Sequence, residues 1–257
     1  MADMSGTLSP AEAEAAEWRL RQDMAAVFRI GARLGWNEHI GNHNSVMLPR
    51  RRADDEPLFL INPRGYLFQE LTASALIVCT LDGRVVRGRG ELRKVAFHIH
   101  ARIHLHNPDA ACVLHVHPRF LTALSLLEDP SLALGHHNNL LLNDRVVIDT
   151  AGEAPVDDDA EGDRIARLMA GKSVMIMANH GVTVAGPTVH DAFDELYIAE
   201  RTAMYQMTAL ASGQRIRELP QRARRNWHGP WGEMLDARLH LDAWRRVLDR
   251  EEPDYAR

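Results

Sequence analysis

The stretch 111–118 constrains the fold of this chain more than any other. It is an apolar run that ends in His115, Val116, His117 and a proline. Side chains two positions apart lie on the same face of a β-strand, so the run predicts a buried strand with both imidazoles on one face at its end. We expect Leu114 and Val116 to face the core and the two histidines to face outward.

A second apolar run carries a third histidine. Residues 173–178 are mostly apolar, Asn179, His180 and Gly181 follow, and residues 182–186 resume the run. This pattern predicts two strands joined by a tight turn or a bulge, where Gly181 allows a backbone conformation that side chains disfavour. His180 would then also lie at a strand end.

Three histidines at neighbouring strand ends can hold a divalent metal and leave one position open for a substrate. A single His-x-His pair is weaker evidence, because the chain has 14 histidines. One surface imidazole and one buried imidazole would explain such a pair equally well. The two separate segments together favour a metal site.

The composition is that of one soluble enzyme domain. Of the 257 residues, 46% are hydrophobic and 25% are charged, which is ordinary for a chain that buries one large core. The net charge of −5 argues against a nucleic-acid-binding protein, because phosphate neutralisation needs a basic surface. Cys79 and Cys112 lie in apolar runs and are expected to be reduced core residues. No signal segment and no apolar stretch of membrane-spanning length is found, so we expect a cytoplasmic protein without a membrane partner.

The remaining patterns predict helices packed on a sheet. We expect strands at residues 45–48, 58–62, 77–80 and 84–87, the last two forming a hairpin. We expect helices at residues 9–34, 92–106, 119–127 and 188–210. The prediction is an α/β fold, a three-layer α/β/α sandwich with a mainly antiparallel central sheet. Residues 1–219 form the predicted metal-binding domain. Residues 220–257 form a helical extension whose tryptophans pack on the domain or on a neighbouring subunit: Trp227, Trp231 and Trp244.

Four blocks of the sequence resemble the class II aldolase/adducin family. They are residues 41–45, 61–65, 107–117 and 179–181, in the order and at the spacing found in that family. The resemblance covers roughly residues 20–210. It implies that the metal ligands are His115, His117 and His180, and that the protein is a homotetramer with active sites between subunits.

The chain departs from the family at its catalytic positions. Where aldolases of the family have Ser-Ser-Glu, this sequence has Lys94, Val95 and Ala96. The acid/base carboxylate is therefore missing, together with two hydroxyls that hold a phosphate. The family's Thr/Ser-Gly phosphate contact is altered to Arg64 and Gly65. Because arginine pairs with carboxylates as well as phosphates, we expect a substrate that bears a carboxylate.

Two residues are candidates for the proton transfer that the missing glutamate performs in the family. His100 lies one helical turn after Ala96, and Glu91 is the nearest upstream carboxylate, although a carboxylate at a helix start is also explained by the helix dipole. The other histidines of this helix are expected to be solvated or structural. The predicted substrate contacts are Asn42, Arg64, Gly65, Lys94 and His137. His137 lies where the family brings in a tyrosine from the adjacent subunit, and it either contacts substrate across an interface or is simply exposed.

We predict a divalent-metal-dependent lyase that cleaves a C–C bond of a small oxo or hydroxy acid, a decarboxylase rather than a sugar-phosphate aldolase. In both reactions a metal stabilises the charge left by bond cleavage, and decarboxylation tolerates loss of the glutamate. The alternatives are an iron(II)-dependent oxygenase that performs oxidative decarboxylation and a non-catalytic, adducin-like binding or scaffold domain. We expect zinc as the metal, with manganese and iron as the other candidates. The expected partner is a small carboxylate or carbonyl compound.

Overall fold

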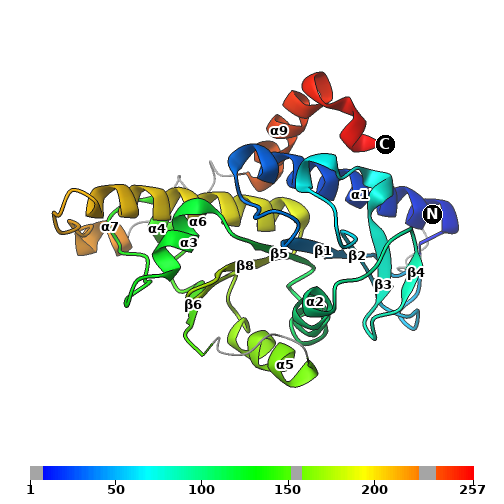
Figure 1. Cartoon of the computed structure of the whole chain (residues 1–257), viewed down its shortest axis with the longest axis horizontal. Helices are drawn as coiled ribbons and strands as arrows, with labels where there is room; N and C mark the ends of the chain where they lie inside the picture. Colours follow the sequence, from blue (N-terminus) through cyan, green and yellow to red (C-terminus); the bar gives the residue numbers. More distant parts are fainter. Residues whose placement is uncertain (1–7, 152–157, 226–235) are drawn as a thin grey trace.

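A mixed β-sheet forms the middle layer of the computed structural model, which describes residues 8–151, 158–225 and 236–257 (Figure 1). In these residues the sheet has eight strands in the order β4-β3-β2-β1-β5-β8-β7-β6. They are β1 (His43–Met47), β2 (Leu58–Ile61), β3 (Ile77–Thr80), β4 (Val85–Arg87), β5 (Cys112–Val116), β6 (Val146–Asp149), β7 (Val174–Met177) and β8 (Gly181–Gly186). All neighbouring strands are antiparallel except β6 and β7. The mainly antiparallel sheet is therefore confirmed.

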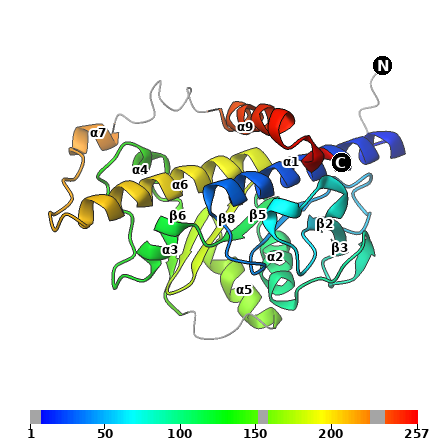
Figure 2. The same ribbon diagram turned by 45° about the horizontal axis from the view of Figure 1, so that its top comes forward.

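Helices cover both faces of the sheet and complete the predicted three-layer sandwich. Figure 2 shows α1 (Pro10–Leu34) and α6 (Val189–Leu210) above the sheet and α5 (Asp159–Leu168) below it, beside α2 (Lys94–His106). The shorter helices are α3 (Arg119–Ser125), α4 (Asn138–Leu141), η1 (Phe68–Glu70) and η2 (Ala73–Ala75). Cys79 and Cys112 are free thiols buried in this fold, as predicted. None of the described helices is long and apolar enough to cross a membrane.

The two longest helices begin where the sequence predicts. Ser9 caps α1, because its hydroxyl accepts a hydrogen bond from the amide of Glu12, whose carboxylate accepts one from the amide of Ser9 at 2.8 Å. Gly35 ends this helix with a left-handed φ of 67°. Thr188 caps α6 by accepting from the amide of Asp191. All these contacts join residues close in sequence, so the helix ends are visible in the sequence itself.

Strand β5 lies near the centre of the sheet and is buried on both faces. Leu114 and Val116 face the core beneath α1 and α6, as predicted. The expectation that the alternate residues face outward is wrong, because α2 and α5 cover that face too. Val113 belongs to this second core, and His115 is only 3% exposed. The imidazole of His115 therefore lies in a nearly water-free environment.

The C-terminal segment packs on its own chain. Its described elements are α7 (Gln221–Arg225), α9 (Ala237–Glu251) and η3 (Pro253–Ala256). Leu248 and Tyr255 are fully buried in the core that α1 and α6 share, and Arg29 of α1 pairs with Glu252 and Asp254. Trp244 packs against the same core, whereas two other tryptophans lie outside the described residues: Trp227 and Trp231. The division of the chain at residue 219 stays a prediction.

Candidate metal centre

Three histidines from two distant segments converge beside strand β5. His115 lies in β5, His117 follows it directly, and His180 lies in the turn between β7 and β8. One ring nitrogen from each histidine lies within 4.8 Å of the others. The Nε2 atoms of His115 and His180 are 3.2 Å apart. The fold thus brings together the three residues that the sequence singles out as ligands.

Hydrogen bonds hold the far side of two of these rings. Nδ1 of His115 lies 3.1 Å from Oγ1 of Thr183, and Nδ1 of His117 lies 2.8 Å from the carboxylate of Glu38. Such partners fix the tautomer and leave Nε2 free for a metal. Nε2 of His117 is buried and has no hydrogen-bond partner among the described residues. A buried nitrogen without a partner is unfavourable, so this donor set fits a divalent metal such as zinc.

The turn before β8 depends on two residues with different roles. Asn179 has a φ of 58°, a left-handed conformation that asparagine tolerates better than most residues. We expected Gly181 to adopt a backbone conformation that side chains disfavour, and this is wrong, because the positive φ falls on Asn179. Gly181 instead permits a close approach. A Cβ atom there would lie 2.5 Å from Cδ2 of His117 and 2.9 Å from the carbonyl oxygen of Val116.

Burial keeps two of the candidate ligands neutral. It lowers the pKa of His115 well below the usual value, and the neighbouring His43 and His180 lower it further. The pKa of His180 is lowered as well, chiefly by burial and then by His117. Neutral imidazole is the form that binds metals, so this environment reduces competition from protons.

Asn42, a predicted substrate contact, lies in the loop that carries Glu38. Its Oδ1 accepts a hydrogen bond from the amide of Glu38 at 2.6 Å, and its carbonyl accepts one from Nδ2 of Asn62 at 3.2 Å. The residue is 3% exposed, and its own Nδ2 has no partner in the described part of the chain. Asn42 therefore has a fixed position next to Glu38, the residue that orients His117, and its contact with substrate stays a prediction.

Four other predicted site residues lie at the surface. Arg64 and Glu91 form an exposed ion pair with 3.9 Å between Nη1 and Oε2. Gly65 follows in a turn with a φ of 92°, and Lys94 is the exposed first residue of α2. Glu91 is thus directed toward Arg64 and solvent rather than held in a buried setting.

Arg93, which the sequence reading passed over, brings a positive charge to the triad. Its Nη1 donates to the carbonyl oxygen of Gly41 at 2.7 Å. Burial is the main cause of the lowered pKa of His43 and of His180, and the charge of Arg93 lowers both further. Arg93 immediately precedes Lys94, which the sequence already indicates as a substrate contact. Only the fold decides which of these neighbouring cations turns toward the histidines.

The predicted proton shuttle His100 lies behind the site instead of facing it. It has no exposed surface, and its ring nitrogens lie 2.8 Å from Nδ1 of His43 and 2.5 Å from the hydroxyl of Ser45. A fully buried ring cannot contact a substrate, so we correct the placement of His100 to a supporting position. His43 is the residue in front of it, and it stacks on His115 with 4.8 Å between ring centroids. The alternation of His43 and Ser45 in one strand was a period-two signal that could have identified this face.

The position that matches the family's glutamate is an apolar contact in this protein. Ala96 is 1% exposed and packs with Phe59 and Ile61 between α2 and the sheet. His137 comes from another part of the fold, at the start of α4, where the neighbouring His136 packs on the ring of Tyr205 at 4.8 Å. A role for His137 across a subunit interface stays a prediction.

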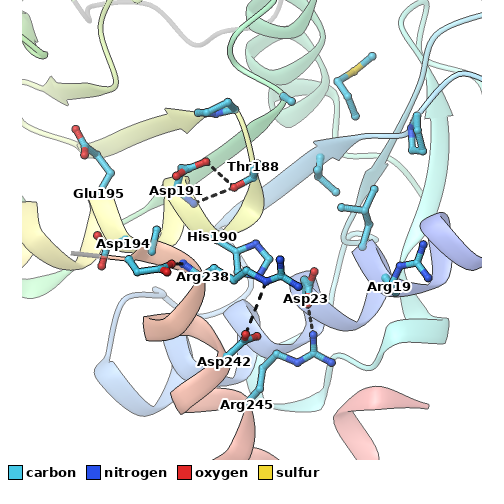
Figure 3. A pocket seen from close by; sticks show the side chains of 18 of the residues that line it. Arg19, Asp23, Thr188, His190, Asp191, Asp194, Glu195, Arg238, Asp242 and Arg245 are labelled. Atoms are coloured by element: carbon cyan, nitrogen blue, oxygen red, sulfur yellow. Dashed lines mark hydrogen bonds and ion pairs between the residues drawn. The ribbon is translucent and has the colours of Figure 1, made fainter. Parts of the chain in front are cut away.

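A cavity of about 1280 Å³ is lined by residues of α1, α6 and α9 (Figure 3). Six of its polar side chains form pairs: Asp23 with Arg245, Thr188 with Asp191, and Arg238 with Asp242. No residue of the triad lines this cavity. We therefore place the functional site at the histidines.

Comparison with known proteins agrees with this geometry. Residues 22–207 match the family model of the class II aldolase and adducin N-terminal domain. The chain belongs to the class II aldolase and adducin family. A relative from Caulobacter vibrioides named "Putative aldolase class 2 protein" is 32% identical over 246 residues, which cover 94% of this chain and 93% of the relative. Human beta-adducin is 28% identical over 250 residues, which cover 90% of this chain and 33% of adducin.

A solved structure of the family has nearly the same fold throughout. The aldolase II superfamily protein from Pseudomonas syringae superposes with a TM-score of 0.83 and 29% identity, over 97% of this chain and 98% of that one. Class II aldolases depend on a divalent metal. The histidine triad of the present chain is suited to hold one. Because the family also contains adducins, membership alone does not decide between catalysis and binding.

Proposed function

We propose that this class II aldolase family member is a divalent-metal-dependent lyase that decarboxylates a small oxo or hydroxy acid. The observation that carries the proposal is the buried Nε2 of His117, which has no partner among the described residues although its ring is held from behind by Glu38. A binding domain without a metal would have no use for such an arrangement. Zinc is the metal we propose, held by His115, His117 and His180.

The residues around the triad suit a carboxylate substrate. A bound divalent metal supplies Lewis-acid polarisation of a substrate oxygen and stabilises the charge that develops as the C–C bond breaks. We assign attraction of the carboxylate to Arg93. Asn42 stays a predicted substrate contact. Arg64, Gly65 and Lys94 stay predicted contacts for the outer part of the site.

The lack of a carboxylate at Ala96 favours decarboxylation over aldol cleavage. An aldolase needs a positioned acid/base at the reacting hydroxyl, and such a group contributes about 10²–10⁴-fold to the rate. Decarboxylation releases CO₂ and then needs a single proton at carbon, which solvent can deliver. We therefore expect negligible cleavage of phosphorylated ketoses and aldoses.

Metal analysis combined with a substrate panel tests the proposal. Protein purified without chelator should contain stoichiometric zinc and release CO₂ from a 2-oxo or hydroxy acid in the absence of oxygen. His117→Ala should lose both the metal and the activity while keeping its circular dichroism spectrum. His106→Gln, which changes an exposed histidine of α2, is the matched control and should keep both.

Each alternative function gives a different result in the same assays. Bound iron with oxygen uptake would identify the iron(II)-dependent oxygenase, since an all-histidine site also binds iron. Absence of both metal and turnover would identify an adducin-like binding domain. Rapid cleavage of a sugar phosphate by the unmodified protein would contradict the decarboxylase assignment.

The cationic contact is tested with three matched variants. Arg93→Gln should raise the KM for the carboxylate substrate about tenfold, because it removes a charge-assisted hydrogen bond. Arg64→Gln and Lys94→Gln remove equal charges from exposed positions nearby, and their effects on KM should be smaller. A larger increase in KM for Lys94→Gln than for Arg93→Gln would instead assign the carboxylate contact to Lys94, as the resemblance to the family suggests.

A further inference from the structure

A continuous chain of hydrogen bonds runs from the triad into the core between β1 and α2. His43 and Ser45 share one face of β1, and His100 and His104 lie one turn apart on α2. Nδ1 of His43 is 2.8 Å from Nε2 of His100, whose Nδ1 is 2.5 Å from the hydroxyl of Ser45. That hydroxyl is 2.7 Å from Nε2 of His104. Nδ1 of His104 ends the chain 2.7 Å from the carbonyl oxygen of Ala110.

The carbonyl at the inner end sets the direction of every hydrogen bond. A carbonyl only accepts, so Nδ1 of His104 carries a hydrogen, and Nε2 of the neutral ring accepts from Ser45. Ser45 has then used its hydrogen and accepts from Nδ1–H of His100. By the same step, Nε2 of His100 accepts from Nδ1–H of His43. Burial lowers the pKa of His104 to about 4 and that of His100 well below its usual value, so both rings are neutral near pH 7.

The outer end of the chain is Nε2 of His43, a lone pair with no partner among the described residues. His43 pairs with His115 across β1 and β5, and the two rings stack with an interplanar angle of 22°. His43 therefore belongs to the wall of the triad. A free imidazole can exchange donor and acceptor between its nitrogens, whereas this one is locked with an acceptor at its outer end.

We infer that His43 is a specificity-determining residue whose Nε2 accepts a hydrogen bond from a hydroxyl group of the substrate. The inference rests on the proposed function and narrows its substrates to acids that carry a hydroxyl group beside the oxo group that takes up the electron pair of the broken C–C bond. An oxo oxygen only accepts hydrogen bonds, so it would face the lone pair of His43 without a shared hydrogen. Sites built to pair a hydroxyl discriminate against analogues that lack it, because the buried partner is left unpaired.

The tautomers are tested first, without ligand and without an activity assay. Spectra of ¹⁵N-histidine-labelled protein, both metal-free and zinc-loaded, report which ring nitrogen carries hydrogen. We expect Nδ1–H on His43, His100 and His104, and loss of the His43 pattern in Ser45→Ala. His106→Gln should leave all three patterns unchanged. Nε2–H on His43 in the unmodified protein would overturn the inference, whether or not Ser45→Ala folds.

The substrate contact is tested with lactate and propionate, which differ by one hydroxyl group. Calorimetry on zinc-loaded protein should give a preference for lactate that falls about tenfold in His43→Phe, which keeps a stacked ring but has no acceptor. An unchanged preference would overturn the role of His43 and leave the proposed function intact. If neither acid binds the unmodified protein, the proposed carboxylate function fails, and the substrate contact of His43 fails with it.

Discussion

At the scale of single residues, the site depends on close approach as much as on ligand identity. The ring of His117 lies directly over the backbone of Gly181, and Glu38 holds the same ring from the other side. A ligand that is held on two sides is pre-oriented, which lowers the ordering cost of metal binding. Residues that never touch the metal therefore contribute to its affinity.

Gly181→Ala should lower the affinity for zinc about 10–100-fold, the range seen when residues that orient a ligand are changed. The added methyl group would lie 2.5 Å from His117, and that ring would have to move. Zinc affinity is measured by competition with a chelator. Gly186→Ala is the control, because its methyl group would meet the backbone of Ala192 at 2.7 Å, at the other end of β8. It should lower stability without changing zinc affinity, and equal losses of affinity in both variants would contradict the contact.

At the scale of elements, helix α6 anchors the start of α3, which begins two residues after His117. Glu200 of α6 accepts hydrogen bonds from the amides of Phe120 at 2.9 Å and Leu121 at 2.8 Å. A carboxylate is favoured at a helix N-terminus. Burial nevertheless raises the pKa of Glu200 to about 7, against the lowering effect of these two amides. The position of α3 is therefore tied to a carboxyl group that is only partly ionised near neutral pH.

Glu200→Gln should remove a pH dependence of folding stability between about pH 4.5 and 7. In this range the folded state holds a proton on Glu200 that the unfolded state has lost, so stability decreases as pH rises. The free energy of unfolding attributable to this group should fall by about 3 kcal/mol across the range. Denaturant unfolding at several pH values measures the effect, with the exposed Glu14→Gln as control. Identical pH profiles for the unmodified protein and Glu200→Gln would disprove this account.

At the scale of the whole molecule, several apolar side chains of α6 and of the residues that follow α3 are exposed, and these two helices lie side by side (Figure 1). Leu126 is 62% exposed and Leu127 is 40% exposed at the end of α3, and Tyr205 and Leu210 of α6 are exposed as well. Exposed apolar groups of this kind mark contacts between proteins. The predicted homotetramer follows from the resemblance to the family and was supported by tryptophans of the extension, but Trp244 packs within its own chain. The exposed ends of α3 and α6 are a better basis for the same prediction.

Light scattering should show a tetramer at micromolar concentration, and Leu126→Glu should shift it toward smaller species. A charge placed in a buried interface loses its hydration without gaining a partner. Leu105→Glu introduces the same charge at a leucine of α2 that is 50% exposed, and it should leave the assembly unchanged. A monomer in the unmodified protein would contradict the tetramer.

The features that could be predicted before the fold was known depend on neighbours in the chain. The cap of α1 at Ser9 joins residues three apart, and the face shared by His115 and His117 follows from the strand period of two. That His180 lies close to these two histidines could be predicted because the four sequence blocks occur at the spacing found in the family. Local hydrogen bonds and backbone periodicity act in any fold, so they can be read before the fold is known.

Features that depend on contacts between distant segments could be recognised only in the folded chain. His43 and His100 are 57 positions apart, and no local pattern shows that they share a hydrogen bond. The burial of His100, the turn of Arg93 toward the triad and the approach of His117 to Gly181 are set by how α2 and the β7–β8 turn pack on the sheet. The free energies of these contacts depend on the distances between the groups and on the exclusion of water from them. Both conditions exist only once the chain has folded.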